Sequence, residues 1–212
     1  ADYYNHCDFF EDEIINKYSI KNSNSINIMV CNSLFYLGWA YYPWSFNEPS
    51  KNNVIFIDTE TLPGRYYELY NKGLTCVHEV GHYLGLLHTF SNIGECIDGD
   101  LISDTPVEKT PNFECNHNRD TCPNLPGKDP ISNYMDYSPD DCMFEFTFIQ
   151  INRMWDMIDR YKPSLKENSQ NNYINFVNIK YNINYYRRGK GICIHKTLST
   201  IRYKPKFEHV SK

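Results

Sequence analysis

The chain has 212 residues and a formal net charge of −5, with 41% hydrophobic and 16% aromatic residues and a mean hydropathy of −0.59. This length fits one domain, or one domain with an extension, and the aromatic content allows a packed core. No run of about 18 apolar residues occurs, which excludes a membrane-spanning helix, and we expect no nucleic acid among the partners of this acidic chain.

The N-terminal part of the chain predicts a helix and two strands. Asp8 and Glu11 resemble a capping pair, and apolar side chains at helical spacing continue to about Tyr18. In residues 26–30, Ile or Val at every second position alternates with Asn27 and Met29, which indicates a half-buried strand. Residues 54–57 are all apolar and predict a second strand.

The segment from residue 78 to residue 88 reads HEVGHYLGLLH, which is the pattern HExxHxxGxxH. On a helix, His78 and His82 lie four positions apart, so both imidazoles project from one face. Gly85 can adopt a positive φ at little cost and end the helix. The chain can then turn and bring His88 back to the same metal ion.

Three protein ligands and one open position are the arrangement that catalytic zinc adopts. Glu79 follows the first ligand on the helix predicted over residues 72–84, where it can hold and deprotonate the zinc-bound water. The alternative is an ordinary core helix that carries histidines. Five fixed positions coincide by chance in such a chain with odds on the order of 10⁻⁵, so the zinc site is favoured.

Eight cysteines are many for a cytosolic protein of this size, and none of them forms a CxxC pair. Four follow the histidine motif in a loop-rich stretch, which is typical of an oxidised, secreted domain. A second metal site is the alternative, but the spacings suit disulfides better, and sequence alone allows three pairings. The four are Cys96, Cys115, Cys122 and Cys142, whereas Cys7, Cys31, Cys76 and Cys193 have no assigned partner.

The second half of the chain predicts a long ordered loop and one further helix. Residues 91–141 are rich in Gly, Pro, Asn and Asp and show little periodicity. Thr147 and Gln150 form a capping box, and Pro163 ends the helix that follows. Its apolar face is expected to be core, and it consists of Phe148, Ile151, Trp155 and Ile158.

Charge separates the C-terminal part of the chain from the rest. Residues 1–162 carry 11 Lys and Arg against 24 Asp and Glu, a net charge of −13, whereas residues 163–212 carry 10 against 2, a net charge of +8. We therefore expect a domain over residues 1–163 and a basic, Asn- and Tyr-rich tail over residues 164–212. A weakly ordered extension is favoured over a nucleic-acid arm, a contact to an anionic surface, or a clamp on the acidic domain.

The histidine motif and a methionine turn at Asn133–Tyr137 (NYMDY) resemble the metzincin clan of zinc endopeptidases. Through Leu87–Phe90, Asp104–Pro106 and Cys142–Thr147, the chain resembles the pappalysin family more closely, in its secreted cytophagalysin-like branch of bacteria and fungi. The similarity covers about residues 26–163. It implies an α+β metzincin-type domain with a twisted mixed sheet, an active-site helix above a loop-rich lower half, and a C-terminal helix.

The resemblance also implies a role for each residue of the site. The three histidines of the motif would bind one catalytic zinc ion, and Glu79 would act as general base and general acid. Met135 would form a hydrophobic floor beneath the zinc ligands. Tyr137 would stabilise the tetrahedral intermediate, and a buried core tyrosine is the alternative.

Two disulfides and a calcium site are further implications of the resemblance. The cysteine pairing would be Cys96–Cys122 and Cys115–Cys142. Calcium would bind in the loop after the third histidine, where oxygen ligands are supplied by Asp98, Asp100, Asp104 and Thr105. The spacing matches no standard calcium loop, so solvated turn carboxylates are an equal alternative.

These features predict a secreted, extracellular, monomeric zinc endopeptidase that acts on protein or peptide substrates in an extended conformation. The strand at residues 54–57 would border the cleft and pair with the substrate. Asp141, with Asp140, would favour Arg or Lys after the cleaved bond, and exposed loop charges are the alternative. A non-hydrolytic zinc-bound binding or toxin-like module is the rival function, but such a protein usually loses its base or a ligand, and none is missing.

Overall fold

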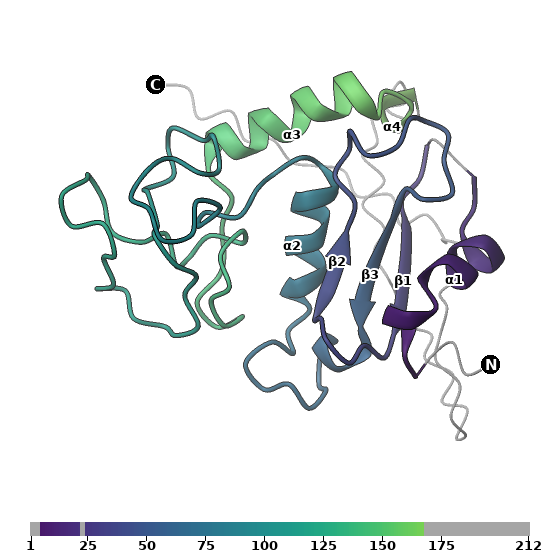
Figure 1. The fold of residues 1–212 in the computed structure, drawn as a ribbon, viewed down its shortest axis with the longest axis horizontal. Helices are drawn as coiled ribbons and strands as arrows, with labels where there is room; N and C mark the ends of the chain where they lie inside the picture. The colour runs from purple at the N-terminus through teal and green to yellow at the C-terminus, as the bar shows by residue number, and fades with distance from the viewer. Residues whose placement is uncertain (1–4, 22–23, 168–212) are drawn as a thin grey trace, which may run out of the picture.

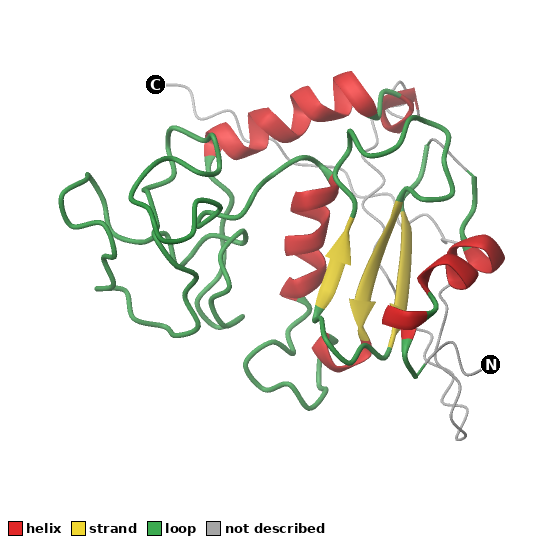
Figure 2. Ribbon diagram, in the orientation of Figure 1, coloured by secondary structure: helices red, strands yellow, loops and turns green. Residues whose placement is uncertain are grey.

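The computed structural model of the protein describes residues 5–21 and 24–167 (Figure 1). They form the expected α+β domain, with a small mixed sheet, helices against both of its faces, and a long loop-rich part (Figure 2). None of the described helices is long and apolar enough to span a membrane. In chain order the elements are η1 (Cys7–Phe9), α1 (Glu11–Tyr18), β1 (Asn27–Cys31), β2 (Gly38–Ala40), β3 (Val54–Asp58), η2 (Thr59–Thr61), α2 (Leu74–Tyr83), α3 (Phe148–Tyr161) and α4 (Ser164–Glu167).

The central strand of the sheet is β3. It pairs in parallel with β1 and antiparallel with β2, so the strand order is β1–β3–β2. Both hydrogen-bonding edges of β3 are occupied, and the prediction that residues 54–57 pair with a substrate is therefore wrong. Within the described part of the chain, the outer edge of β2 has no strand partner. This three-residue strand is too short for a sequence pattern to indicate.

Side chains alternate across the sheet between two apolar clusters. Met29 and Phe56 pack against α1 on one face, whereas Val30 and Ile55 pack against Tyr83 of α2 on the other. Because helices cover both faces, β1 is almost fully buried, and the prediction of a half-buried strand is wrong. All five residues of β3 are buried, as its unbroken apolar run predicted.

The first helix begins without the predicted capping pair. Helix α1 starts at Glu11, and no side chain caps its N-terminus. The Asp8 carboxylate instead accepts a hydrogen bond from the Leu34 amide at 2.7 Å. Cys7, in η1, is disulfide-bonded to Cys31 at the end of β1, a pair that the sequence left unassigned. This disulfide ties the N-terminal segment to the sheet.

The capping box of α3 is confirmed. The Thr147 hydroxyl accepts a hydrogen bond from the Gln150 amide at 3.1 Å, and the Gln150 side chain accepts one from the Thr147 amide at 2.8 Å. The helix lies along one end of the domain, above α2 in Figure 1. Its predicted core face is wrong, since Phe148 is 73% exposed and Trp155 is 44% exposed. The helix packs through another side, where Met157 meets the end of α2.

The part of the chain between α2 and α3 contains no helix or named strand, which confirms the ordered loop predicted there. The two implied disulfides, Cys96–Cys122 and Cys115–Cys142, cross-link it. The Arg119 guanidinium adds a polar cross-link, because it donates hydrogen bonds to the carboxylates of Glu108 and Asp129 at 2.5 Å each. Covalent and ionic links thus take the place of regular secondary structure.

The structure describes only the first residues of the predicted basic tail. Ser164–Glu167 form α4, and Leu165 packs against the apolar cluster on the α2 side of the sheet. Residues 168–212 lie outside the described residues, together with Cys193, so the domain boundary at residue 163 stays a prediction. Among the described cysteines, Cys76 alone is not in a disulfide.

Candidate metal centre

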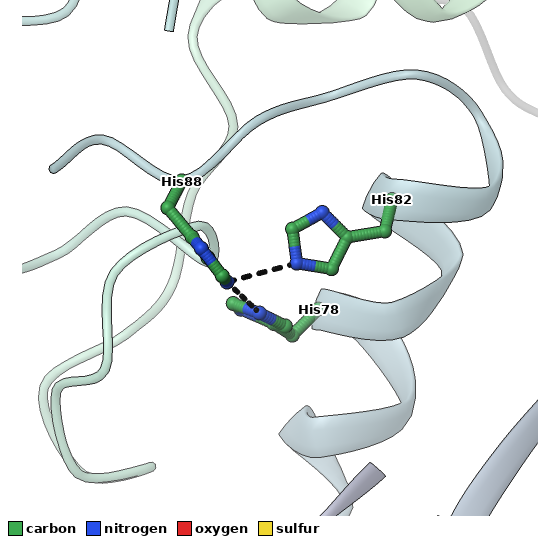
Figure 3. A group of neighbouring side chains, drawn as sticks. All are labelled: His78, His82 and His88. Carbon is green, nitrogen blue, oxygen red and sulfur yellow. Dashed lines mark hydrogen bonds between the residues drawn. The ribbon is translucent and has the colours of Figure 1, made fainter. Parts of the chain in front are cut away.

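Three histidine side chains converge on one point beside α2 (Figure 3). The Nε2 atom of His88 lies 3.2 Å from that of His78 and 2.9 Å from that of His82. Figure 3 shows His78 and His82 projecting from the helix toward His88, which comes from the segment that follows it. The two helical ligands and the returning third ligand meet as the motif predicted.

The return of the chain depends on Gly85. Its φ is +93°, a conformation that side-chain-bearing residues rarely adopt. The last turn of α2 closes when the Leu86 amide donates a hydrogen bond to the Gly81 carbonyl at 2.9 Å. A β-carbon on Gly85 would also stand 2.5 Å from Cγ of Met157 in α3. Glycine is therefore required here both by the backbone conformation and by the packing of α3.

Backbone carbonyl groups orient two of the imidazoles. Nδ1 of His78 lies 2.6 Å from the Tyr134 carbonyl oxygen, and Nδ1 of His82 lies 2.8 Å from the Leu86 carbonyl oxygen. Each Nδ1 is thus the protonated donor, and each Nε2 directs its lone pair toward the centre. Burial lowers the pKa of His78 to about 3 and also lowers the pKa values of His82 and His88.

Neutral imidazoles with convergent Nε2 atoms are the donor set that zinc binds. One ring nitrogen of each histidine lies within 4.8 Å of those of the other two, so a single ion would be shared by all three. His78, His82 and His88 therefore fit a zinc ion. Within the described part of the chain, no other group of three or more metal-binding side chains occurs.

The side chain of Glu79, a residue of α2, lies between the helix and the edge strand β2. The side chain is only 5% exposed, and no described residue donates a hydrogen bond to its Oε2 atom. Burial raises the pKa of Glu79 to about 8. A β-carbon on Gly38 of β2 would lie 2.8 Å from Cγ of Glu79, so the strand passes directly over this carboxyl group. Its free oxygen is available for a water or a substrate atom.

The methionine turn lies under the histidines. Met135 is fully buried, and its backbone is held at both ends, since its amide donates to Asn133 Oδ1 at 2.9 Å and its carbonyl accepts from the Thr89 amide at 3.2 Å. The Asn133 amide group is in turn paired with the Gln150 side chain of α3 at 2.8 Å. The turn is thus fixed to the segment after the third histidine and to α3.

Tyr137 lies against two of the histidines. Its ring centroid is 4.8 Å from that of His88 and 5.8 Å from that of His78. The side chain is 38% exposed, so it is not the buried core tyrosine that was the alternative. Burial is the largest cause of its raised pKa, followed by the charge of Glu79. The phenol therefore remains a neutral hydrogen-bond donor beside the metal centre.

Comparison with known proteins identifies the family. A family model described as pregnancy-associated plasma protein-A, of peptidase family M43, matches residues 9–159. The chain belongs to the pappalysin family. Its α+β fold is that of a metzincin, as the sequence indicated.

Relatives with known names agree with this assignment. An extracellular metalloprotease of Colletotrichum graminicola is 42% identical over 132 residues, which are 61% of this chain and 48% of that protein. One of Neurospora crassa is 45% identical over 134 residues, or 60% and 46% of the two chains. This pappalysin chain spans about half the length of the curated relatives it matches.

Two solved structures of mirolysin have the same fold. Mature mirolysin of Tannerella forsythia in complex with a cleaved peptide has a TM-score of 0.64 and 30% identity, and the match covers 71% of this chain and 59% of that one. Mirolysin in complex with a small compound has a TM-score of 0.63 and 33% identity, over 68% and 57% of the two chains. Both matches show that the fold is shared.

A polar network behind the third ligand was missed by the sequence analysis of this pappalysin. Thr89, which follows His88, donates a hydrogen bond from its hydroxyl to Glu108 Oε2 at 2.7 Å. The other oxygen of Glu108 accepts the 2.5 Å hydrogen bond from Arg119. The histidine motif is thereby connected to the loop-rich part. No residue spacing predicts this, because the three residues meet only through the tertiary fold.

The residues expected to bind calcium form a small buried cluster. The Thr105 hydroxyl donates to Asp100 Oδ2 at 2.7 Å, and the Ile102 amide donates to Asp100 Oδ1 at 3.0 Å. Asp104 is used differently, since it accepts hydrogen bonds from the Thr147 hydroxyl and the Ile149 amide at the start of α3. Calcium at Asp100 and Thr105 stays a prediction.

The two acids after the methionine turn have different surroundings. Asp140 is buried, and its Oδ2 atom accepts hydrogen bonds from the amides of Lys72 and Leu74 at 2.7 and 3.4 Å, at the N-terminus of α2. Its Oδ1 atom has no partner among the described residues. Asp141 is exposed and forms an ion pair with the Lys72 ammonium group. A free buried oxygen is therefore found on Asp140 rather than on Asp141.

Proposed function

We propose that this chain is the catalytic part of a secreted, zinc-dependent endopeptidase. The observation that carries the proposal is the convergence of three neutral histidine Nε2 atoms beside the buried, unpartnered carboxyl oxygen of Glu79. The names of the fungal relatives, which are extracellular metalloproteases, support both the activity and the extracellular location. A monomer is the expected oligomeric state.

In the proposed mechanism, the metal ion and two residues of the chain have separate roles. Zinc bound by the three histidines would polarise the scissile carbonyl group and lower the pKa of water toward about 7. Glu79, in its ionised form, would accept the proton of the attacking water and then deliver it to the leaving amine. Tyr137 would donate a hydrogen bond to the oxygen of the scissile carbonyl as negative charge develops there. No covalent acyl-enzyme is formed in this scheme.

The substrate would bind along the outer edge of β2. This edge has no strand partner among the described residues, and the face of β2 at Gly38 packs against Glu79, the proposed general base, which supports this binding site. A peptide that adds a strand there would present its backbone to the metal centre. Such pairing needs an extended segment, so flexible or unfolded parts of proteins are the expected substrates.

A basic residue is the proposed preference after the cleaved bond. Asp140 supports it, because a buried carboxyl oxygen without a partner is an acceptor that a guanidinium or ammonium group could satisfy. Asp141 is already paired with Lys72 and would add only long-range attraction. Replacing Asp140 by Asn should therefore reduce the preference for Arg and Lys more than the same replacement of Asp141.

The proposal is tested by incubating a peptide library with the zinc-loaded wild type and with zinc-loaded Glu79→Ala, followed by mass spectrometry. Cleavage by the wild type alone is the expected result, with 1,10-phenanthroline abolishing it and serine- or cysteine-directed reagents leaving it unchanged. Zinc content is measured for both proteins, so that loss of the ion is not mistaken for loss of the base. Equal cleavage by both proteins, or cleavage that survives the chelator, would contradict the mechanism.

A further inference from the structure

An aromatic pair that the proposed mechanism does not use lies next to the metal centre. Tyr42 follows β2 by two residues, and its ring centroid lies 5.5 Å from that of His82 at an interplanar angle of 81°. Trp44 stacks on Tyr42, with the centroids 4.8 Å apart and the planes within 7° of parallel. The two rings form an apolar surface that begins at a metal ligand and extends outward.

Trp44 is held in place and is still accessible. Its ring also meets Tyr161 of α3 edge-on, at a centroid distance of 6.2 Å. The intervening Pro43 is buried, which restrains the backbone between the two stacked rings. Trp44 nevertheless remains 43% exposed. A rigidly supported, solvent-facing aromatic ring is a common feature of surfaces that bind peptide side chains.

Of the two adjacent tyrosines, Tyr41 and Tyr42, only Tyr42 is directed toward the metal centre. The Tyr41 hydroxyl donates to Glu11 Oε1 at 2.5 Å, and its ring packs into the cluster between the sheet and α1. Tyr42, in contrast, lies within electrostatic range of the catalytic carboxyl group, since the charge of Glu79 contributes to its raised pKa after burial. Tyr41 therefore supports the fold, and Tyr42 faces the site.

Tyr42 and Tyr137 reach the histidines from separate segments of the chain. Tyr137 contacts His78 and His88 from the methionine turn, and Tyr42 contacts His82 from the segment after β2. A peptide paired with the outer edge of β2 would leave the strand at its C-terminal end, where Tyr42 and Trp44 follow. One of its side chains would then lie against the stacked rings.

We propose that Tyr42 and Trp44 form an aromatic subsite that binds a large apolar side chain, with aromatic side chains favoured, at one position of the peptide substrate. The subsite rests on the proposed peptidase function and adds a specificity to it. A planar side chain can stack on the open part of the Trp44 ring, whereas a methyl group leaves most of that surface in water.

The test compares Trp44→Ala with a matched control, Trp155→Ala. Trp155 is 44% exposed, close to the value for Trp44, but it lies on α3 beneath the Lys166 ammonium group. The substrates are pairs of peptides that carry Phe or Ala at one position, moved in turn along the residues flanking the cleaved bond. At one position, Trp44→Ala should lower the ratio of kcat/KM for the Phe peptide to kcat/KM for the Ala peptide about threefold to tenfold. Trp155→Ala should leave this ratio unchanged.

Two outcomes separate the subsite from the function on which it rests. If the wild type cleaves the peptides and Trp44→Ala shows the same selectivity at every position, the subsite is wrong and the peptidase function stands. If the zinc-loaded wild type cleaves nothing, the function fails, and calorimetry of peptide binding to Glu79→Gln, with and without Trp44→Ala, tests the subsite alone. If Trp44→Ala weakens the binding of the Phe peptide and not that of the Ala peptide, the subsite is supported. If Trp44→Ala leaves the binding of both peptides unchanged, the subsite is wrong.

Discussion

The sulfur atom of Met135 lies directly beneath Gly81, so that a β-carbon on Gly81 would stand 2.5 Å from Sδ. Gly81 occupies the helical turn between His78 and His82, and Met135 is fully buried. The methionine turn can approach α2 only because this position has no side chain. A variable position of the HExxHxxGxxH pattern is therefore constrained by the floor of the metal centre.

Replacing Gly81 by Ala should destabilise the fold and weaken zinc binding. The added methyl group collides with a fully buried side chain, and overpacking of this kind typically costs about 1–3 kcal/mol. Urea denaturation and zinc titration measure both effects. In a Met135→Ala background the same substitution should cost much less, because the collision is removed. An equal cost in both backgrounds would contradict the packing argument.

Replacing His88 by Ala should abolish stoichiometric zinc binding. Two histidines on one helical face remain, but the third nitrogen that closes the site is lost. His117 is exposed in the loop-rich part and serves as the matched control, since His117→Ala should keep one zinc ion per chain. The measurement is metal content after dialysis against a zinc buffer. Full occupancy in His88→Ala would show that the third ligand is another residue.

The network behind the third ligand should be important for both stability and zinc affinity. Arg119→Met leaves the carboxylates of Glu108 and Asp129 buried without their cation, which typically costs about 3–5 kcal/mol. Thr89→Val removes only the hydroxyl that bonds Glu108 and should cost about 1–2 kcal/mol. Thr89→Ser restores the hydroxyl and should recover zinc affinity. If Thr89→Val matched the wild type in zinc titration, the network would have no positioning role.

The folded state should become less stable as the pH rises in calcium-free buffer, because Asp100 loses its proton. Burial raises its pKa from 3.8 to about 7 in the folded chain. Between these values the folded state holds a proton that the unfolded state has released, so stability falls as the pH increases through this window. Urea denaturation at several pH values measures the slope. Asp100→Asn should have a smaller slope, and an unchanged slope would assign the effect to other groups.

Added calcium should reverse this loss of stability by binding at Asp100 and Thr105. Above pH 7 the Asp100 carboxyl group is charged and buried, so a bound cation would stabilise the folded state in proportion to its affinity. The melting temperature of the wild type at pH 8 should then rise with calcium concentration, and that of Asp100→Asn should not. Identical responses of the two proteins would place calcium elsewhere or exclude it as a ligand.

Local sequence patterns correctly predicted the features that depend on contacts between residues close together in the chain. The helical ligand pair, the turn at Gly85 and the capping box of α3 depend on contacts within a few residues, and each was found where expected. The apolar face of α3 was wrong because the same periodicity does not say which side of the domain the helix meets. Trp155 and Phe148 are exposed for this reason.

The sequence by itself indicated the three candidate zinc ligands, because helix geometry and one glycine bring three histidines of one short segment close together. It also determined the family, through motifs that can be read along the chain. Only the tertiary structure decided that β3 is central and that β2 offers the free edge, since strand order depends on non-local hydrogen bonds. It alone placed Arg119 behind the third ligand and Tyr42 beside the second, because those contacts join segments that no local spacing relates.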